Sequence, residues 1–104
     1  MATFHHFGVP SSAVYEGAGY VEGGKVYVTD PETHPFRIEF LRFEEGSPMH
    51  ELVRTRPHAA FAVDDLDAAL EGRNVIVEPF NAMPTLRVAF ITDGDAVIEL
   101  MQNL

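Results

Sequence analysis

The stretch "RPHAAFAVDDLDAALEG" (56–72) joins a short apolar strand to the beginning of a helix. The run His58–Val63 predicts a strand, and the acidic pair that follows it begins a helix that Gly72 ends. Side chains of a strand alternate between its two faces. One face of this strand carries a histidine and two small side chains: His58, Ala60 and Ala62. We therefore expect this face to form the floor of a pocket.

The bulk composition narrows the class of protein. A chain of 104 residues with 46% hydrophobic residues is long enough for one compact domain and too apolar to be disordered. No run approaches the roughly 18 apolar residues of a membrane span, no signal peptide is visible, and cysteine is absent, so we expect a cytoplasmic protein. A net charge of −9 argues against nucleic acid as a partner, because no basic stripe is present to contact phosphates.

The rest of the chain consists of strand patterns separated by turns. The glycine-rich segment Ser11–Gly24 predicts a loop with a short strand near Tyr15, and "SPMHELVRT" (47–55) predicts a linker helix with Ser47 as its N-cap. Further strands are expected at 3–10, 25–30, 36–43, 74–80, 86–92 and 96–102. This pattern indicates an α+β fold with far more strand than helix.

The two halves of the chain repeat one pattern. "HFGVP" (6–10) aligns with "HAAFA" (58–62), "VYVTD" (26–30) with "AFITD" (89–93), and "RIEFL" (37–41) with "VIELM" (97–101). Because the matches occur in the same order, we interpret the chain as one domain, 1–104, made of two related modules. Module one spans about 1–46, the linker helix about 47–55, and module two about 56–104.

Each module contributes one histidine in its first strand and one glutamate in its last: His6 and Glu39, then His58 and Glu99. A carboxylate inside an apolar strand is costly to bury unless it is paired, hydrogen-bonded or bound to a cation. Two imidazoles and two carboxylates form a ligand set that Zn, Ni, Co, Mn or Fe accepts. If the modules pack with pseudo-two-fold symmetry, all four groups can converge on one point.

These motifs resemble the vicinal oxygen chelate superfamily, which includes glyoxalase I, bleomycin-resistance proteins and extradiol dioxygenases. The resemblance covers nearly the whole chain and is strongest over 57–102. It implies two paired βαβββ-type modules that form a curved mixed sheet around a cavity, and a divalent metal ion held by His6, Glu39, His58 and Glu99. Since Ser11–Gly24 is too rich in glycine for a good helix, the first module is expected to be abbreviated.

The function that this resemblance implies is that of a small metal-dependent, glyoxalase-like enzyme. Its substrate would be a small molecule with vicinal oxygens, the metal would act as a Lewis acid, and Glu99 or Glu39 could serve as general base. Lyase, isomerase and dioxygenase chemistry all remain open. The alternative is a metal-free protein that binds and sequesters a small molecule, as bleomycin-resistance proteins do, and a vestigial site is a third possibility.

Several residues have competing interpretations. His5 competes with His6 as first ligand, and strand alternation favours His6, because it places His5 on the opposite face. Glu39 could instead pair with Arg37 or Arg42, and Arg37 could bind an anionic substrate. His58 could be a strand-end histidine that is merely hydrogen-bonded.

The short first module also has a consequence for assembly. It leaves part of its own sheet uncovered, so we expect a homodimer. The aromatic side chains expected to be buried between the two copies are Phe4, Phe7, Phe40 and Phe43.

Overall fold

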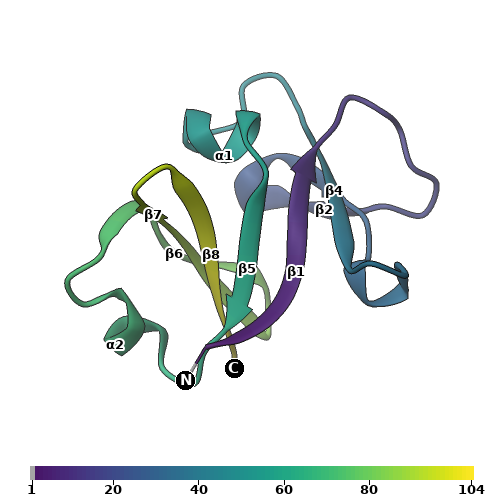
Figure 1. The fold of residues 1–104 in the computed structure, drawn as a ribbon. Helices are drawn as coiled ribbons and strands as arrows, with labels where there is room; N and C mark the ends of the chain where they lie inside the picture. The colour runs from purple at the N-terminus through teal and green to yellow at the C-terminus, as the bar shows by residue number, and fades with distance from the viewer. Residues whose placement is uncertain (1) are drawn as a thin grey trace.

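The structure is a computed structural model that describes residues 2–104 as one curled sheet with a few short helices (Figure 1). The strands are β1 (Thr3–Pro10), β2 (Gly19–Val21), β3 (Val26–Val28), β4 (Ile38–Phe43), β5 (His58–Ala62), β6 (Asn74–Met83), β7 (Leu86–Asp93) and β8 (Ala96–Asn103). The helices are α1 (Glu51–Thr55) and α2 (Leu66–Leu70), and the 3-10 turns are η1 (Glu22–Gly24) and η2 (Pro31–Thr33). None of the helices in the described range has the length and apolar character needed to cross a bilayer.

The sheet has two halves related by a pseudo-two-fold arrangement. Its strand order is β2-β3-β4-β1-β5-β8-β7-β6, so the first strand of each half lies at the centre (Figure 1). There β1 and β5 run antiparallel, with Phe7 opposite Ala59, His6 opposite Ala60 and Gly8 opposite His58. This architecture confirms the predicted α+β fold of two paired modules in a curved mixed sheet.

The register of the central strands places each histidine and its glutamate on one face. In the first half Gly8 lies opposite Glu39, and in the second half Ala60 lies opposite Glu99. Gly8 and Ala60 each follow a histidine by two residues, and side chains two apart in a strand share a face. The alignment of the histidines and glutamates in the sequence is therefore confirmed.

The alignment of "VYVTD" with "AFITD" is wrong by three residues. Val26 of β3 pairs with Phe43, which lies four residues after Glu39. In the second half, the residue four positions after Glu99 is Asn103, and it pairs with Leu86 of β7. Val26 thus corresponds to Leu86 rather than to Ala89. By the same offset Asp30, which follows β3, corresponds to Phe90.

Both faces of the second module are packed. On the outer face, α2 contributes Leu66 to a cluster with Ala89, Ile91 and Leu100. On the inner face, Val53 of α1 packs with a second cluster: Ala60, Val88, Phe90, Val97 and Met101. The carboxylate of Asp65 accepts a hydrogen bond from the Ala68 amide at 3.1 Å, which caps α2 at its N-terminus.

The first module lacks the corresponding helix, as expected from its glycine content. No helix lies between β1 and β2, and β2 begins at Gly19 rather than near Tyr15. The predicted N-cap of the linker helix is also wrong, because α1 begins at Glu51 and His50 caps it. The Ser47 hydroxyl instead donates a hydrogen bond to the Gly24 carbonyl at 2.6 Å, which ties the linker to η1.

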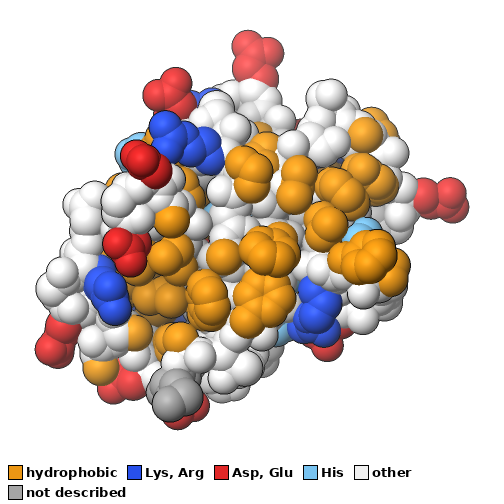
Figure 2. Space-filling view, viewed as in Figure 1, with side chains coloured by type: hydrophobic (Ala, Val, Ile, Leu, Met, Phe, Trp, Pro, Cys, Tyr) orange, Lys and Arg blue, Asp and Glu red, His pale blue; other side chains and the backbone are white. Residues whose placement is uncertain are grey.

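Without that helix, aromatic side chains of β1 remain exposed on the outer face. Figure 2 shows hydrophobic side chains gathered in the middle of this face, where β1 and β5 lie in Figure 1. Phe4 is 42% exposed and Phe7 is 50% exposed, whereas Phe40 and Phe43 are half-buried. The homodimer stays a prediction, and this face is the one that a second copy would cover.

Replacing Gly8 tests how closely the His58 ring of β5 packs against β1. A Cβ at position 8 would lie 2.1 Å from Cε1 of His58, so the ring or the strand must move. We expect Gly8→Ala to destabilise the protein by about 1–3 kcal/mol, which is typical of overpacking, as measured by chemical denaturation. Gly19→Ala is the matched control, because no atom lies within 4 Å of the added Cβ. Equal stability of the two variants would contradict this packing.

Candidate metal centre

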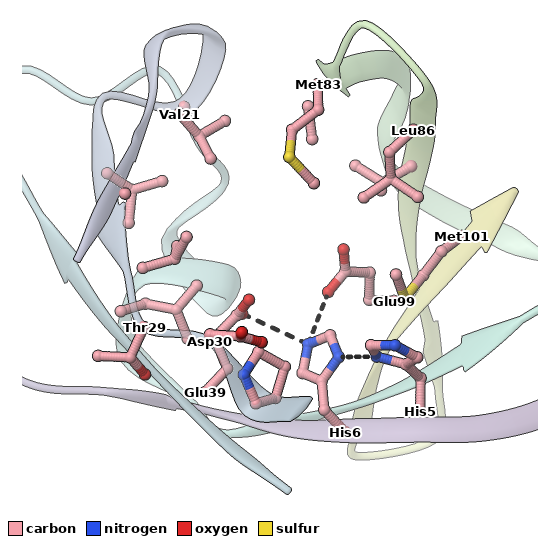
Figure 3. Close-up of a pocket in the computed structure, with 18 of the residues that line it drawn as sticks. His5, His6, Val21, Thr29, Asp30, Glu39, Met83, Leu86, Glu99 and Met101 are labelled. Atoms are coloured by element: carbon pink, nitrogen blue, oxygen red, sulfur yellow. Dashed lines mark hydrogen bonds and ion pairs between the residues drawn. The ribbon is translucent and has the colours of Figure 1, made fainter. Parts of the chain in front are cut away.

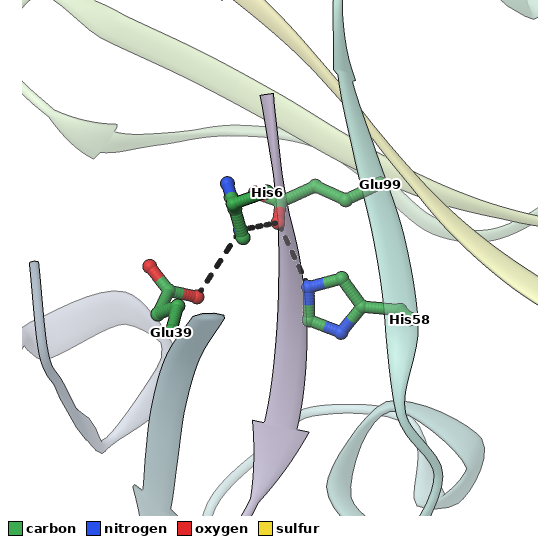
Figure 4. A group of neighbouring side chains, drawn as sticks. All are labelled: His6, Glu39, His58 and Glu99. Carbon is green, nitrogen blue, oxygen red and sulfur yellow. Dashed lines mark hydrogen bonds and ion pairs between the residues drawn. The ribbon is translucent and has the colours of Figure 1, made fainter. Parts of the chain in front are cut away.

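Four side chains from the four central strands meet on the inner face of the sheet (Figure 4). Nε2 of His6 lies 3.3 Å from Oε1 of Glu39 and 3.5 Å from Oε1 of Glu99. Nε2 of His58 lies 3.1 Å from the same oxygen of Glu99. One ligand atom from each residue lies within 4.8 Å of every other. The structure thus brings together all four residues that the sequence singles out.

The geometry of this group fits a divalent metal ion. Metal–ligand bonds of about 2.0–2.2 Å place neighbouring ligand atoms roughly 3.0–3.5 Å apart, which matches the contacts to Nε2 of His6 and His58. Nε2 of His6 is buried and makes no aligned hydrogen bond, despite the two carboxylates beside it. A buried nitrogen lone pair without a hydrogen bond is the atom that a metal ion would take up. The donor set of two nitrogens and two oxygens suits Zn, Ni, Co, Mn or Fe.

The two carboxylates and two imidazoles also change one another's proton affinity. Burial by itself lowers the pKa of the His6 imidazole, but Glu39 and Glu99 outweigh burial and raise the pKa to about 9. Burial by itself raises the pKa of the Glu99 carboxyl, but His58 and His6 outweigh it and hold the pKa well below its usual range. Without metal, the two carboxylates therefore favour the protonated form of His6, and the two imidazoles favour the ionised form of Glu99.

His5 also lies at the site, contrary to the expectation from strand alternation. Phe4 and His6 pair with the consecutive residues Phe61 and Ala60, so His5 is the extra residue of a β-bulge. Its Nδ1 lies 2.8 Å from Nδ1 of His6. The prediction that His5 occupies the opposite face is wrong, because a bulge interrupts the alternation.

The contact between the two rings determines which nitrogen of His6 is free. One of the two Nδ1 atoms must carry the proton that they share. If His6 donates it, Nε2 of His6 has a free lone pair that points to Glu39 and Glu99, as a metal ligand requires. The other ring nitrogen of His5, Nε2, lies 3.7 Å from Oε2 of Glu32. His5 is therefore a positioning residue for His6, and only its adjacency to His6 hints at this in the sequence.

A cavity of about 490 Å³ opens above His6, Glu39 and Glu99, whereas His58 does not line it. Figure 3 shows His6, Glu39 and Glu99 at its floor, with Val21 on one wall and Met83 on the opposite wall. The prediction that His58, Ala60 and Ala62 form the floor of a pocket is wrong, because none of them lines this cavity: His58 and Ala60 are buried, and the floor is formed by residues of β1, β4 and β8. Apolar walls over a polar floor are typical of sites for small molecules.

Arg37 does not lie among the residues that line this cavity. Its Nε donates a hydrogen bond to the backbone carbonyl of His5 at 2.6 Å, and its φ angle is +58°. Arg42 stacks over the ring of Tyr27, 4.4 Å from the ring centre. Neither arginine forms an ion pair with Glu39, whose carboxylate instead lies beside His6.

Comparison of the sequence with family models and with curated proteins gives no match. Two solved structures share the fold. A hypothetical protein from Bacillus halodurans C-125 is 18% identical with a TM-score of 0.73, over 99% of this chain and 95% of that one. Methylmalonyl-CoA epimerase from Mycobacterium tuberculosis is 16% identical with a TM-score of 0.64, over 98% of this chain and 88% of that one. At such identities the likeness shows the fold alone.

Substitutions of the adjacent histidines separate a ligand from a positioning residue. We expect His6→Ala to abolish tight metal binding, because it removes a ligand atom. His5→Ala should weaken binding about 10–100-fold, the usual effect of losing a partner of a metal-bound histidine. Titration calorimetry with Zn and Ni measures both losses. His5→Gln serves as the control, since its amide oxygen can accept the proton of His6 and should restore part of the affinity; no effect of either His5 variant would contradict the positioning role.

The raised pKa of His6 predicts an unusual dependence of stability on pH. Protonated His6 stabilises the folded protein fully below pH 6.5, the pKa of an unperturbed histidine. This stabilisation is lost as the pH rises through about 9. The stabilisation that ionised Glu99 contributes depends on pH in the opposite direction. It is present at neutral pH and is lost as the pH falls to the lowered pKa of Glu99 in strong acid. Metal-free protein should therefore melt at a lower temperature at pH 9.5 than at pH 6. His6→Gln should remove much of this difference, and a flat profile in the parent protein would contradict the arrangement.

Proposed function

We propose that this protein is a small metal-dependent enzyme of the glyoxalase-like class. The observation that supports the proposal most is the convergence of His6, Glu39, His58 and Glu99 beneath one cavity. A divalent ion bound there supplies Lewis-acid polarisation of a substrate oxygen. The cavity, with apolar walls over a polar floor, suits a small substrate whose adjacent oxygens face the floor.

The two glutamates are not equivalent, and we propose Glu39 as the general base. Oε1 of Glu99 contacts both imidazoles and its side chain is 11% exposed, so it is well placed to remain a ligand. Glu39 contacts only His6 and its side chain is 15% exposed. A carboxylate with fewer partners is freer to turn toward a substrate and take a proton.

The fold neighbour named methylmalonyl-CoA epimerase suggests which reaction to test first. Epimerisation at a carbon beside a carbonyl needs removal and return of one proton, and a single carboxylate such as Glu39 can perform half of that exchange. Isomerase, lyase and dioxygenase reactions all remain open for a metal-binding group under a cavity. The alternative function is sequestration of a small molecule without metal.

Proton exchange at carbon tests the proposed function directly. Metal-loaded protein is incubated in D₂O with a panel of small hydroxyketones and 2-oxo aldehydes, and loss of the C–H signal is followed by ¹H NMR. We expect exchange of at least one compound to require the metal, and Glu39→Gln to lower the rate by at least 100-fold, the size of a typical general-base effect. Glu99→Gln is the comparison variant, and its main effect should be loss of metal.

Two other results would favour the alternative function or exclude Glu39 as the base. If a compound binds tightly to protein treated with chelator and no exchange occurs with any metal, the protein sequesters its ligand. If Glu39→Gln exchanges protons as fast as the parent protein, Glu39 is not the base.

A further inference from the structure

The charged groups that line the cavity are all acidic apart from histidine. Besides Glu39 and Glu99, its wall includes Asp30 and Glu32, which lie at the beginning of η2 beside His5 (Figure 3 labels Asp30). Within residues 2–104, no lysine or arginine belongs to the lining. Any charge that the ligand carries must therefore be accommodated by carboxylates.

Five of the seven basic side chains make contacts away from the cavity. Most of the arginines bind backbone oxygens or other side chains: Arg37 binds the His5 carbonyl, Arg54 the Met49 carbonyl, Arg56 the Asp95 carbonyl and Arg87 the Asp67 carboxylate, while Arg42 stacks on Tyr27. Thus no described arginine with such a partner can turn toward a ligand without breaking a contact.

A bound metal ion would not cancel this negative charge. A divalent ion would balance the charges of Glu39 and Glu99, and the carboxylates of Asp30 and Glu32 would add negative charge beyond those two. The Asp30 carboxylate accepts a hydrogen bond from the Glu32 amide at 2.9 Å, which fixes it at the cavity wall. In the second half Phe90 occupies the position of Asp30 and packs edge-on against His58, with ring centres 5.2 Å apart. The acidic wall is therefore confined to the first half of the site.

A separate feature indicates that a ligand binds at this end of the cavity. His6 is 2% exposed, and its Nε2 lies at the cavity floor without an aligned hydrogen bond. Asp30 and Glu32 line the same cavity as His6, so a molecule held at the floor lies within the electrostatic field of their carboxylates. Carboxylates in a cavity wall repel an anion and attract a cation.

We infer that the ligand of this cavity is a small molecule with an apolar body and no negative charge, and that a cationic group increases its affinity. Carboxylates and phosphates, including coenzyme A thioesters, are excluded by Asp30 and Glu32. This inference rests on the proposed function, since it assumes that adjacent oxygens of the ligand face the metal-binding group.

Three catechols of matched shape test the inference, because they present the same pair of oxygens and differ in charge. Dopamine is cationic, 4-ethylcatechol is neutral and 3,4-dihydroxyphenylacetate is anionic. Their affinities for zinc-loaded protein are measured by titration calorimetry without oxygen. We expect the anion to bind at least tenfold more weakly than the neutral catechol, and dopamine to bind at least as tightly as the neutral one.

Removal of the acidic wall should abolish this order. In the double variant Asp30→Asn, Glu32→Gln, loaded with zinc to a measured content, the anion should bind within threefold of the neutral catechol. The control variant Asp64→Asn, Glu71→Gln removes two exposed carboxylates outside the cavity lining and should keep the parent order.

The outcomes separate the inference from the proposed function. If all three catechols bind through zinc with equal affinity, or the anion binds most tightly, the inference is overturned and the function stands. If the charge order appears equally without zinc, the inference stands and the metal-dependent function fails. If no catechol binds in either state, both are overturned.

Discussion

The burial of the Glu99 carboxylate against two imidazoles at the centre of the sheet constrains the rest of this structure. Glu99 is only 8% exposed, and an isolated ionised carboxylate at such a place costs several kcal/mol. Contacts with His58 and His6, or a metal ion in their place, compensate that cost. Because a slip of one residue would turn every side chain to the other face, the four central strands must keep one register.

That register in turn determines which side chains can surround the site. The His58 ring stands directly against Gly8, which lies opposite it in β1, and any Cβ there would enter the ring. The symmetric partner of Gly8 is Ala60, which is fully buried under His6. Small residues at these two positions are therefore required by the histidines, and the histidines by the carboxylates.

The sequence predicts the centre of the fold because two independent signals agree there. Strand alternation places His58, Ala60 and Ala62 on one face, and a glutamate in an apolar strand indicates a polar partner. The bulge at His5 escapes prediction, since it depends on how β1 pairs with β5 rather than on local pattern. The three-residue error in aligning β3 with β7 has a similar cause, because the connections to β4 and β8 differ in length.

The two halves of the site are alike at the centre of the sheet and differ at its edges. In the second half, α2 covers the outer face and Phe90 packs against His58, so the histidine and glutamate of this half lie in a closely packed part of the protein. In the first half the covering helix is absent, and η2 places Asp30 and Glu32 beside His5. A substitution near His58 thus disturbs packing, whereas one near His6 changes the charge of the cavity wall. Under the proposed function, selectivity for the ligand would therefore reside in the first half, although both halves contribute to the group of histidines and glutamates.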